Sequence, residues 1–572
     1  MGKVWLLLLM VVVVVGEVRG AVLRNGGFES LSGWDCWNIQ CYLNSDRHSG
    51  QHSALATGRN NYWEGPSQMI QVSAGHSYDV SGWMKLLGGG GGQTLMLEID
   101  YTLADNSHHY ETVASSSNKS PQDGWVHLSG AFTVPANLDI RATRFYFQGP
   151  KAGIQFLADD ASVTDTGHSS SGSGSGSHGN SHSHSAIDQL RKSNINVRIT
   201  TAAGVNKNDI TIRVTQTKKA FPFGTAVNSW KYNANDAGGR YRDFIHKHFN
   251  WAVPENALKW PTIEPNRGQK NYDLALNMIH GLKSHGIKVR GHNLVWSVDQ
   301  FVQGWLKNLW GNDLRAVVKA HIQETMQKTR GLLEHWDVNN ENLHGQWFQN
   351  QLHDPSYNLE LFRIAHAQDS GIKLFLNDYN VVANWGSTND YLQQAQQFKG
   401  AGVGLYGLGA QCHFGVEEDP DVNGVKQRLD RLAQAGLPIW VTELDVVAQD
   451  ENRRADFYEK VLRTLYSHPA VEGILFWGFW DQAHWRGEAA ALVRGNNLDL
   501  TAAGRRVLDL LERQWMTEDS RDLAHAGSSY SVRGFHGDYE VQVLNKGQEV
   551  AGLRQRFTLG TSDHTPTLHI PG

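Results

Sequence analysis

The feature that most constrains the fold is a set of short apolar segments that recur eight times after residue 220. Their first residues lie 29 to 48 positions apart, and stretches with helical periodicity separate them. In residues 312–327, for example, positions on one helical face recur at alternating spacings of three and one. Eight strand–helix units over about 300 residues predict a (β/α)8 TIM barrel across residues 220–516. The segments begin at Phe221, Asn250, Ile287, His335, Lys373, Leu405, Pro438 and Glu472.

A different pattern precedes the barrel. In residues 21–166, segments such as LMLEIDYTL and WVHLSGAFTV alternate apolar and polar residues, and clusters of Gly, Asn, Asp and Ser separate them. Short strands interrupted in this way predict a β-sandwich. Residues 167–186 are mostly Gly, Ser and His, which cannot bury enough apolar surface to fold. We therefore expect a solvated linker between the sandwich and the rest of the chain.

Two further strand-like segments flank the barrel, residues 187–219 before it and residues 517–572 after it. We expect them either to pair into one small β subdomain beside the barrel or to form separate hairpins. The chain as a whole is thus expected to be multidomain, with an N-terminal β-sandwich and a C-terminal TIM barrel.

The first twenty residues have the pattern of an export signal. Lys3 precedes an apolar run from Trp5 to Val15, and small residues follow around Gly20. The run is shorter than the roughly 20 apolar residues that span a bilayer. We therefore expect residues 1–20 to be removed, the protein to be secreted into the extracellular space, and no membrane to be a partner.

Composition narrows the partners further. The formal net charge is −5 and no block of Lys and Arg occurs, which argues against nucleic acid as a ligand. Cys36 and Cys41 lie close together and either form a disulfide in an oxidising compartment or stay separate thiols. Cys412 lies in an apolar segment and is expected to be a buried small hydrophobe.

Polar and aromatic residues gather where the predicted barrel strands end. The reacting groups of a TIM barrel collect at the carboxyl ends of its strands. Glu341 follows the fourth strand and Glu443 ends the seventh, so the two carboxyls are expected to face each other across the barrel mouth. The other strand ends contribute Glu255, Asn256, Lys259, His292, Trp296, Asn340, Asn377, Asp378, Gln411, His413 and Trp477, with Trp485 in the last loop.

Paired carboxyls in a pocket lined by tryptophan suit the cleavage of a glycosidic bond. A carboxylic acid must protonate the leaving oxygen while a carboxylate attacks or stabilises the anomeric carbon. Tryptophan faces stack on the C–H faces of sugars, and amides and lysine bind hydroxyl groups. A single glutamate in such a place is more often part of a surface ion pair. Polar residues at the ends of six strands together favour the catalytic interpretation.

Seven motifs in the barrel region resemble glycoside hydrolase family 10, the endo-β-1,4-xylanases. They occur in the family's order over residues 220–515: ENALKW, RGHNLVW, WDVNNE, NDYN, GAQCHF, VTELD and FWGFWDQAHW. Residues 21–166 resemble a family 22 carbohydrate-binding module through NGGFES, NYWEGPSQMI and FYFQGP. The sequence DVNNENLHG in place of DVVNE, together with the flanking β segments, resembles the plant and invertebrate branch of family 10.

The resemblance implies a role for each matching residue. Glu341 would be the general acid/base and Glu443 the nucleophile of a retaining mechanism, which needs neither a metal nor an organic cofactor. Asn340 would bind the 2-hydroxyl of the sugar at the cleaved bond, and His413 would hold the nucleophile with support from Gln411. The remaining sugar contacts would come from Glu255, Asn256 and Lys259 at the next sugar outward, and from His292, Trp296, Trp477 and Trp485 as walls of the inner subsites.

In the sandwich, Trp63, Tyr110 and Tyr146 are the candidates for stacking on sugar rings, and Gln148 is the candidate for binding hydroxyl groups. Tyr101 is the alternative to Tyr110, because the strand register is open. Each aromatic residue alone is more often part of a core than of a binding site. A structural calcium ion in the sandwich is also left open.

One departure from the family bears on the substrate. Where relatives continue RGHxLVW with His-Ser-Gln, this chain has Ser297, Val298, Asp299 and Gln300, in a loop that borders the outer glycone subsite. Xylan is the expected substrate, with the module anchoring the enzyme to plant polysaccharide. A β-1,4-glucanase, or an enzyme with both activities, is the alternative, and a catalytically silent carbohydrate-binding protein is the third hypothesis. Endo and exo action are not distinguished.

Overall fold

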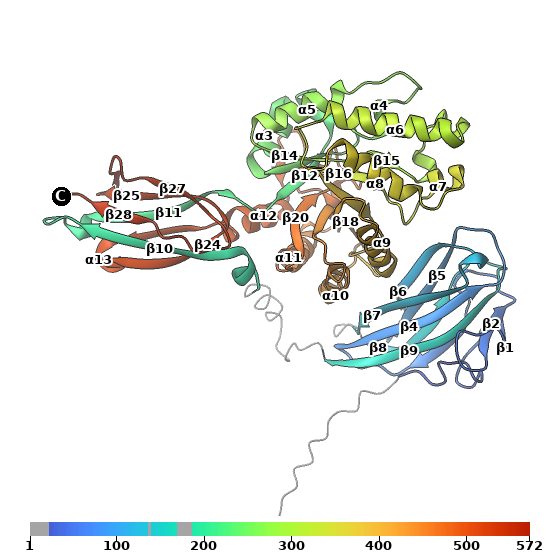
Figure 1. The fold of residues 1–572 in the computed structure, drawn as a ribbon. Coiled ribbons are helices and arrows are strands. Elements are labelled where there is room, and N and C mark those ends of the chain that lie inside the picture. Colours follow the sequence, from blue (N-terminus) through green and yellow to red (C-terminus); the bar gives the residue numbers. More distant parts are fainter. Residues whose placement is uncertain (1–21, 135–138, 169–185) are drawn as a thin grey trace, which may run out of the picture. The chain divides into compact units, whose positions relative to one another are not determined.

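The computed structural model describes residues 22–134, 139–168 and 186–572 (Figure 1). The chain forms two compact units, one built from the N-terminal strands and one from the barrel with its flanking strands. The predicted export signal and nearly all of the predicted linker lie outside the described residues. In the part of the chain that the structure describes, no helix is both long and apolar enough to cross a membrane.

The N-terminal unit is a β-sandwich of two antiparallel sheets, as expected from the alternating pattern. Side chains along β4 point alternately into the core and away from it, and Tyr78, Val80 and Met84 are buried. The first sheet has the order β1 (Gln40–Asn44), β2 (Ser53–Thr57), β9 (Phe156–His168), β4 (His76–Leu86) and β7 (Trp125–Thr133). The second has the order β3 (Ser67–Ile70), β8 (Ile140–Gln148), β5 (Gln93–Leu103) and β6 (His108–Lys119).

The cysteines take the first of the two expected arrangements. Cys36 and Cys41 form a disulfide, and Cys412 is free and buried in the barrel core. In the described residues, His, Cys, Asp and Glu side chains do not gather in a group of three or more that could hold a metal ion.

The second unit contains a closed barrel of eight parallel strands, which confirms the predicted TIM barrel. The strands pair in the order β14-β13-β12-β20-β19-β18-β17-β16, and pairing of β14 with β16 closes the ring. A short strand, β15 (Val295–Trp296), pairs with the end of β16. The eight strands are β12 (Phe223–Val227), β13 (Trp251–Pro254), β14 (Lys288–Gly291), β16 (His335–Asn340), β17 (Lys373–Asp378), β18 (Leu405–Val416), β19 (Ile439–Val447) and β20 (Val471–Phe476).

Helices surround the barrel (Figure 1). The predicted helix at residues 312–327 is α6 (Gly311–Lys328), and its apolar face buries Leu314, Val318 and Ile322. Short helices follow three strand ends: α2 (Ser229–Asn233), α4 (Trp260–Ile263) and α7 (Trp347–Leu352). The longer helices are α3 (Arg240–His248), α5 (Asp273–Ser284), α8 (Tyr357–Gln368), α9 (Thr388–Gly400), α10 (Val422–Ala433), α11 (Glu451–Tyr466) and α12 (Ala502–Asp509).

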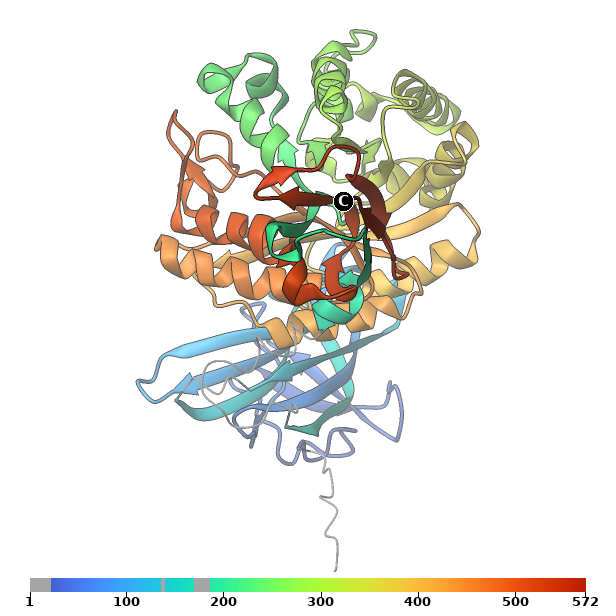
Figure 2. The ribbon, with the colours of Figure 1, turned by 90° about the vertical axis from the view of Figure 1, so that its left-hand side faces the viewer.

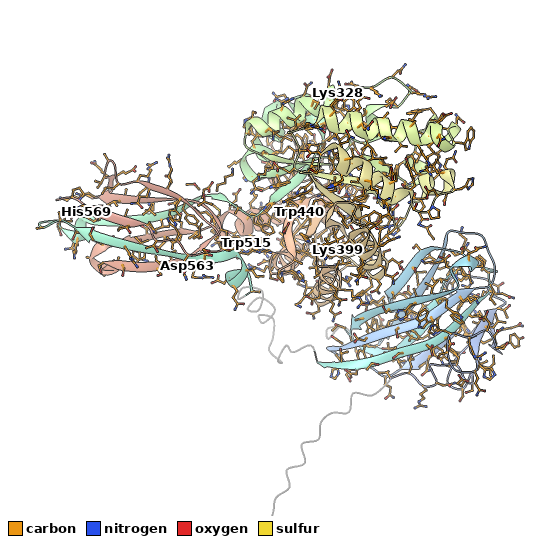
Figure 3. The ribbon with its side chains drawn as sticks, viewed as in Figure 1. Lys328, Lys399, Trp440, Trp515, Asp563 and His569 are labelled. Carbon is orange, nitrogen blue, oxygen red and sulfur yellow. A yellow bond between two sulfur atoms is a disulfide. The ribbon has the colours of Figure 1, made fainter. Side chains whose placement is uncertain are left out.

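Large rings fill the interior of the barrel. Trp251, Phe375 and Trp440 pack together there, and Figure 3 labels Trp440. Gly473 on the neighbouring strand makes the packing possible, because a Cβ atom at this position would lie 2.4 Å from the Trp440 ring. The interior is thus a packed core rather than a channel, and the polar strand ends remain at the barrel mouth.

The two segments that flank the barrel pair with each other and form one small β subdomain. Figure 2 shows strands from the green and red parts of the chain side by side, and β10 pairs with β24 from Lys192 to Arg198. Its sheets have the orders β24-β10-β28 and β23-β11-β25-β26, with β27 also on β25. The strands are β10 (Lys192–Thr201), β11 (Ile210–Lys219), β23 (Glu518–Asp522), β24 (Ser529–Phe535), β25 (Gly537–Asn545), β26 (Gln548–Glu549), β27 (Gln555–Leu559) and β28 (Thr567–Ile570); α13 (Leu523–Ala526) lies between β23 and β24.

The subdomain has its own apolar core and a polar attachment to the barrel. Ile195, Val197 and Val541 are fully buried in this core. Just before β10, the Arg191 guanidinium donates hydrogen bonds of 2.9 to 3.0 Å to three barrel carbonyl groups, those of Tyr466, His468 and Val471. The interpretation as separate hairpins is therefore wrong.

Candidate active site

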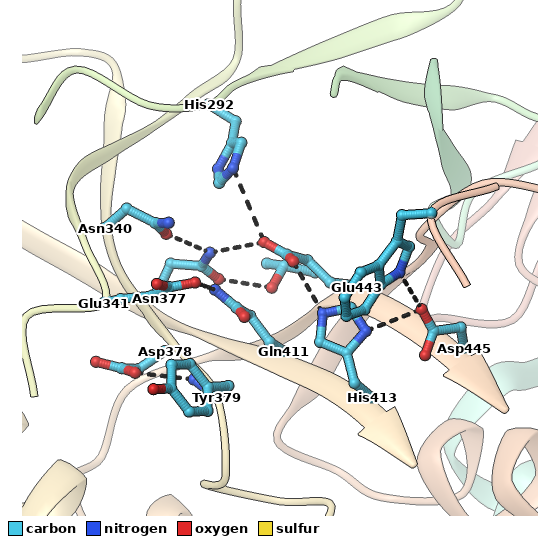
Figure 4. Close-up of polar contacts among 12 residues, drawn as sticks. His292, Asn340, Glu341, Asn377, Asp378, Tyr379, Gln411, His413, Glu443 and Asp445 are labelled. Atoms are coloured by element: carbon cyan, nitrogen blue, oxygen red, sulfur yellow. Dashed lines mark hydrogen bonds and ion pairs between the residues drawn. The ribbon is translucent and has the colours of Figure 1, made fainter. Parts of the chain in front are cut away.

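The barrel brings the predicted polar residues together at its mouth (Figure 4). Asn340 ends β16, Glu341 follows it, and Glu443 lies in β19 on the other side of the barrel. Between these strands, β17 and β18 contribute Asn377 and His413. Figure 4 shows both carboxyl groups pointing into the same space, each held by its own hydrogen bonds.

The backbone and two side chains fix Glu341. Its φ of 57° lies in the left-handed region, which an L-residue adopts only at a cost of roughly 1 kcal/mol or more. The backbone N–H donates to the Asn377 carbonyl at 2.9 Å. Trp296 Nε1 donates to Oε2 at 2.9 Å, and Gln411 Nε2 donates to Oε1 at 3.1 Å. The surroundings thus hold the carboxyl in one orientation.

Electrostatics favour the protonated form of Glu341. Burial raises the pKa of Glu341 to about 7, and the negative charges of Asp378 and Glu443 act in the same direction. The hydrogen bonds from Gln411 and Trp296 oppose this shift but do not cancel it. At neutral pH a large share of this carboxyl group therefore carries the proton that a general acid must give away.

The pKa of Glu443 is shifted in the opposite direction, below its ordinary value. Burial alone would raise its pKa, but the hydrogen bond from His413 and the nearby charges of His292, His413 and Lys259 lower it. His413 Nε2 donates to Oε2 at 3.1 Å, and Asn377 Nδ2 donates to Oε1 at 3.1 Å. His292 Nε2 lies 3.9 Å from Oε1. Glu443 is therefore an ionised carboxylate, as a nucleophile requires.

The charge on His413 depends on a buried carboxylate behind it. His413 Nδ1 donates to Asp445 Oδ2 at 2.9 Å. Burial lowers the pKa of His413, but the charge and hydrogen bond of Asp445, together with Glu443, outweigh burial and raise the pKa to about 9. Trp485 Nε1 and Arg486 Nη1 donate to the same carboxylate at 2.7 and 2.8 Å. His413 thus stays cationic beside Glu443.

A buried carboxylate also holds His292, as Asp445 holds His413. His292 Nδ1 donates to Asp337 Oδ2 at 2.8 Å, and the fully buried Arg290 forms an ion pair with the other oxygen of that carboxylate. Because Nδ1 donates to Asp337, Nε2 is the ring atom that faces Glu443. The Arg290–Asp337 pair therefore orients the imidazole toward the reacting groups.

Asn377 connects Glu443 with Asn340, the residue expected to bind the 2-hydroxyl. Its Nδ2 donates to Asn340 Oδ1 at 2.9 Å as well as to Glu443. Its Oδ1 accepts from Thr442 Oγ1 at 2.6 Å. Asn340 and Asn377 are each only 1% exposed, so these bonds form in a site with little access to water.

Lys259 contacts a residue expected to bind the next sugar, and it also lies near the two glutamates. Its Nζ donates to Asn256 Oδ1 at 2.8 Å and lies 4.8 Å from the centre of the Trp296 ring. Burial lowers the pKa of Lys259, and Glu443, Glu255 and Glu341 counteract that shift. The structure therefore brings Asn256 and Lys259 next to the paired carboxyls, with Glu255 close by.

Residues 213–509 match the family model described as glycosyl hydrolase family 10. The chain belongs to this family. Residues 20–153 match the model of a carbohydrate binding domain. The narrower resemblance of the sandwich to family 22 stays a prediction.

The proteins similar to this chain include plant proteins. Endo-1,4-beta-xylanase 2 of Arabidopsis thaliana is 30% identical over 502 residues, which cover 87% of this chain and 44% of that protein. Anti-sigma-I factor RsgI6 of Acetivibrio thermocellus is 36% identical over 386 residues, 67% of this chain and 49% of that protein. Xylanase 10B from Thermotoga petrophila, solved with xylobiose, is 26% identical at a TM-score of 0.47 and covers 51% of this chain and 94% of its own. The chain spans about half the length of the curated relatives it matches.

One role implied by family 10 differs in the structure. Gln411 was expected to support the nucleophile, but its amide donates to Glu341. Both carboxylate oxygens of Glu443 already accept from Asn377 and His413, so the Gln411 amide turns to the other carboxyl.

The tryptophans differ in how much of their rings they present. Trp485 is 58% exposed and can offer a face to a sugar, whereas Trp477 is 8% exposed and packs in the barrel interior. The Trp477 ring is tilted edge-on to His292, with centroids 5.3 Å apart. Trp296 stacks on Phe301 at 3.7 Å. The expected wall of the inner subsites is therefore most open at Trp485.

The sequence prediction gave no role to four residues that hold the site together. Asp445 lies two positions after Glu443 in β19, on the same side of the strand, and strand periodicity could have identified it. Asn377 was noted at a strand end but given no role. Arg290 and Asp337 lie on neighbouring strands, and pairing Arg290 with His335 and Gly291 with Trp336 puts the two side chains within reach. The sequence offered no direct signal for that contact.

The sandwich presents two of its four candidates to solvent. Trp63 and Tyr110 are 47% and 60% exposed, so their rings can receive a sugar. Tyr146 and Gln148 are each 9% exposed, and the Tyr146 hydroxyl donates to Gln148 Oε1 at 3.1 Å. A ring buried to this extent offers no open face, so the expected stacking by Tyr146 finds no support. The alternative residue, Tyr101, is fully buried in the core and cannot replace Tyr110.

Proposed function

We propose that this chain is a secreted, retaining endo-β-1,4-xylanase whose sandwich module holds it on plant polysaccharide. The observation that carries the proposal is the opposite tuning of two carboxyl groups in one site. The pKa of Glu341 is raised to about 7 and that of Glu443 is lowered, so one is an acid while the other is a carboxylate. This division of protonation states is what the first step of glycoside hydrolysis with retention demands.

In the first step, a Glu443 oxygen bonds to the anomeric carbon while the glycosidic C–O bond breaks. The proton of Glu341 goes to the leaving oxygen, and the sugar stays attached to Glu443 as an ester. Asn340, held by Asn377, is placed to hydrogen-bond the 2-hydroxyl as charge develops on the ring. Lys259 and Asn256 hold the neighbouring sugar in position.

In the second step, the roles of the carboxyl groups change. Esterification removes the negative charge of Glu443, and with it one of the causes that raise the pKa of Glu341. Glu341 then accepts a proton from water as the water oxygen bonds to the anomeric carbon. The ester bond breaks, and Glu443 leaves as a carboxylate that His413 and Asn377 receive.

A β-1,4-glucanase, or an enzyme with both activities, is the second candidate, and the loop after Trp296 favours it. Ser297 turns inward and donates to Asn339 Oδ1 at 2.8 Å. Asp299 turns outward, is 72% exposed at its side chain, and pairs with Lys307 at 3.0 Å. Ser297 is thus a small residue where relatives have the imidazole of His-Ser-Gln, and the smaller side chain would favour the hydroxymethyl group of glucose.

Two assays test the proposal. Proton NMR on xylan or xylo-oligosaccharides should show the β-anomer as the first product, because two inversions retain the configuration. The variants Glu443→Gln and Glu341→Gln should lose turnover of these substrates. First release of the α-anomer would refute the retaining mechanism. Release from carboxymethyl-cellulose would establish the second candidate, and no release from either polymer would favour a binding protein. A secreted mature chain should begin near residue 21, which N-terminal sequencing of exported protein can check.

A further inference from the structure

His344 and Asp378 form a buried ion pair beside Glu341 that the proposed reaction does not use. His344 Nδ1 donates to Asp378 Oδ1 at 2.6 Å, and the two side chains are 11% and 2% exposed. Asp378 ends β17, and His344 lies in the turn that follows Glu341 at the end of β16. The pair thus comes from two adjacent strand ends at the barrel mouth.

Several contacts prevent this pair from separating. The backbone N–H groups of Leu343 and Tyr379 donate to the Asp378 carboxylate at 2.9 Å each. The His344 ring stacks on the Tyr379 ring, with centroids 3.7 Å apart. The carboxylate is therefore held by three donors and the imidazole by a phenol ring.

The pair interacts with Glu341 through the charge of Asp378 and through a backbone hydrogen bond from His344. Figure 4 shows Asp378 and Tyr379 close to Glu341, and the His344 N–H donates to the Glu341 carbonyl at 3.0 Å. After burial, the charge of Asp378 comes first among the causes that raise the pKa of Glu341. A change in the charge of the pair must therefore change the proton affinity of the acid/base.

We propose that His344 is a positioning residue that sets the net charge beside Glu341 and so the pH range in which Glu341 acts as an acid. The inference rests on the proposed acid/base role of Glu341. When His344 is protonated, it screens Asp378. When His344 loses its proton, Asp378 acts on Glu341 unscreened, and Glu341 keeps its proton to higher pH. Acid catalysis then extends further to the alkaline side.

The charged groups around His344 are consistent with this role. Burial lowers the pKa of His344, but the hydrogen bond and charge of Asp378, followed by Glu341 and Asp390, raise it overall. The Tyr379 phenol has a pKa raised to about 12, first by burial, and is neutral in the working range. The charges of three carboxyl groups therefore act on His344, beside a neutral ring and the Ser387 hydroxyl, which lies 3.3 Å from Nε2. The protonation of His344 is thus coupled to that of Glu341.

The test compares the alkaline limb of the kcat/KM profile in three variants on xylo-oligosaccharides. His344→Gln leaves Asp378 unscreened, so the limb should move to higher pH by about 0.5 to 1 unit. Asp378→Asn removes the charge, so the limb should move to lower pH by a similar amount. The double variant should behave like Asp378→Asn, because His344 acts through the carboxylate. The matched control His285→Gln changes an exposed histidine at the end of α5 and should leave the limb unmoved.

Two further measurements isolate Glu341. With an aryl glycoside whose phenolate leaves without protonation, both shifts should disappear. A 13C NMR titration of the Glu341 carboxyl should show its pKa moving in the same directions in the variants, without any turnover. This measurement tests the role of His344 even if the wild-type chain is inactive and the proposed function is refuted. Shifts of the same sign in both single variants, or an unchanged limb in His344→Gln, would overturn the inference. Thermal unfolding checks that each variant folds. If Asp378→Asn does not fold, the result for His344→Gln alone decides the inference.

Discussion

Replacing Asn377 with alanine removes a side chain that holds both the nucleophile and the residue placed at the 2-hydroxyl. The lost bond to Glu443 is 3.1 Å long and has a charged acceptor. Such bonds are worth about 1.5 to 3 kcal/mol. At about 1.4 kcal/mol for each factor of ten, kcat/KM should fall about 10- to 150-fold. Since Asn340 loses its donor as well, we expect the upper part of this range.

The assay is the initial rate on xylo-oligosaccharides, with thermal unfolding measured alongside. Thr442→Val is a suitable control, because it removes only the 2.6 Å bond to Asn377 Oδ1 and should cost less activity than Asn377→Ala. Asn377→Asp keeps the shape but adds a negative charge beside Glu443, which raises the pKa of Glu443 and moves the acidic limb of the profile to higher pH. A folded Asn377→Ala protein within threefold of wild-type activity would show that Glu443 does not depend on this amide.

Three other outcomes follow from the same reasoning. Because the pKa of Glu341 is about 7, kcat/KM on xylan should fall as pH rises through about 7, and a profile that stays flat to pH 9 would contradict this assignment. Burial raises the pKa of Glu98 to about 7, above its unfolded value of about 4.5. The free energy of unfolding of the module should therefore fall as pH rises from about 4.5 through 7. Urea unfolding of the Glu98→Gln variant should show no such fall. Trp63→Ala and Tyr110→Ala should each weaken binding to insoluble xylan about tenfold or more, while rates on short oligosaccharides stay the same; unchanged retention in pull-down assays would argue against a sugar-binding role.

The barrel and its two glutamates could be predicted from the sequence because both depend on local pattern. Eight apolar segments at similar intervals leave few other folds, and parallel strands bring their carboxyl ends to one side. Glu341 and Glu443 follow from that rule, whatever the detail of their surroundings. The closeness of Cys36 and Cys41 in the chain left a disulfide and two separate thiols open, and the structure has the disulfide.

The hydrogen-bond partners could not be predicted in the same way. Gln411 has two carboxyls within reach, and its choice of Glu341 depends on which acceptors other residues have already occupied. Tyr146 and Tyr110 both lie in alternating strands, but only the three-dimensional packing decides that one ring is covered and the other is open. Competition among neighbours sets such details, and a linear pattern does not contain it.

The pairing of β10 with β24 joins the segment before the barrel to the segment after it. A chain cut after the barrel would leave β10 and β11 without their partners and would bare two apolar sheet faces, with open edges that invite aggregation. Residues 517–572 must also be synthesised before the subdomain can form. Anyone trimming this protein for expression should therefore keep both flanks or remove both together.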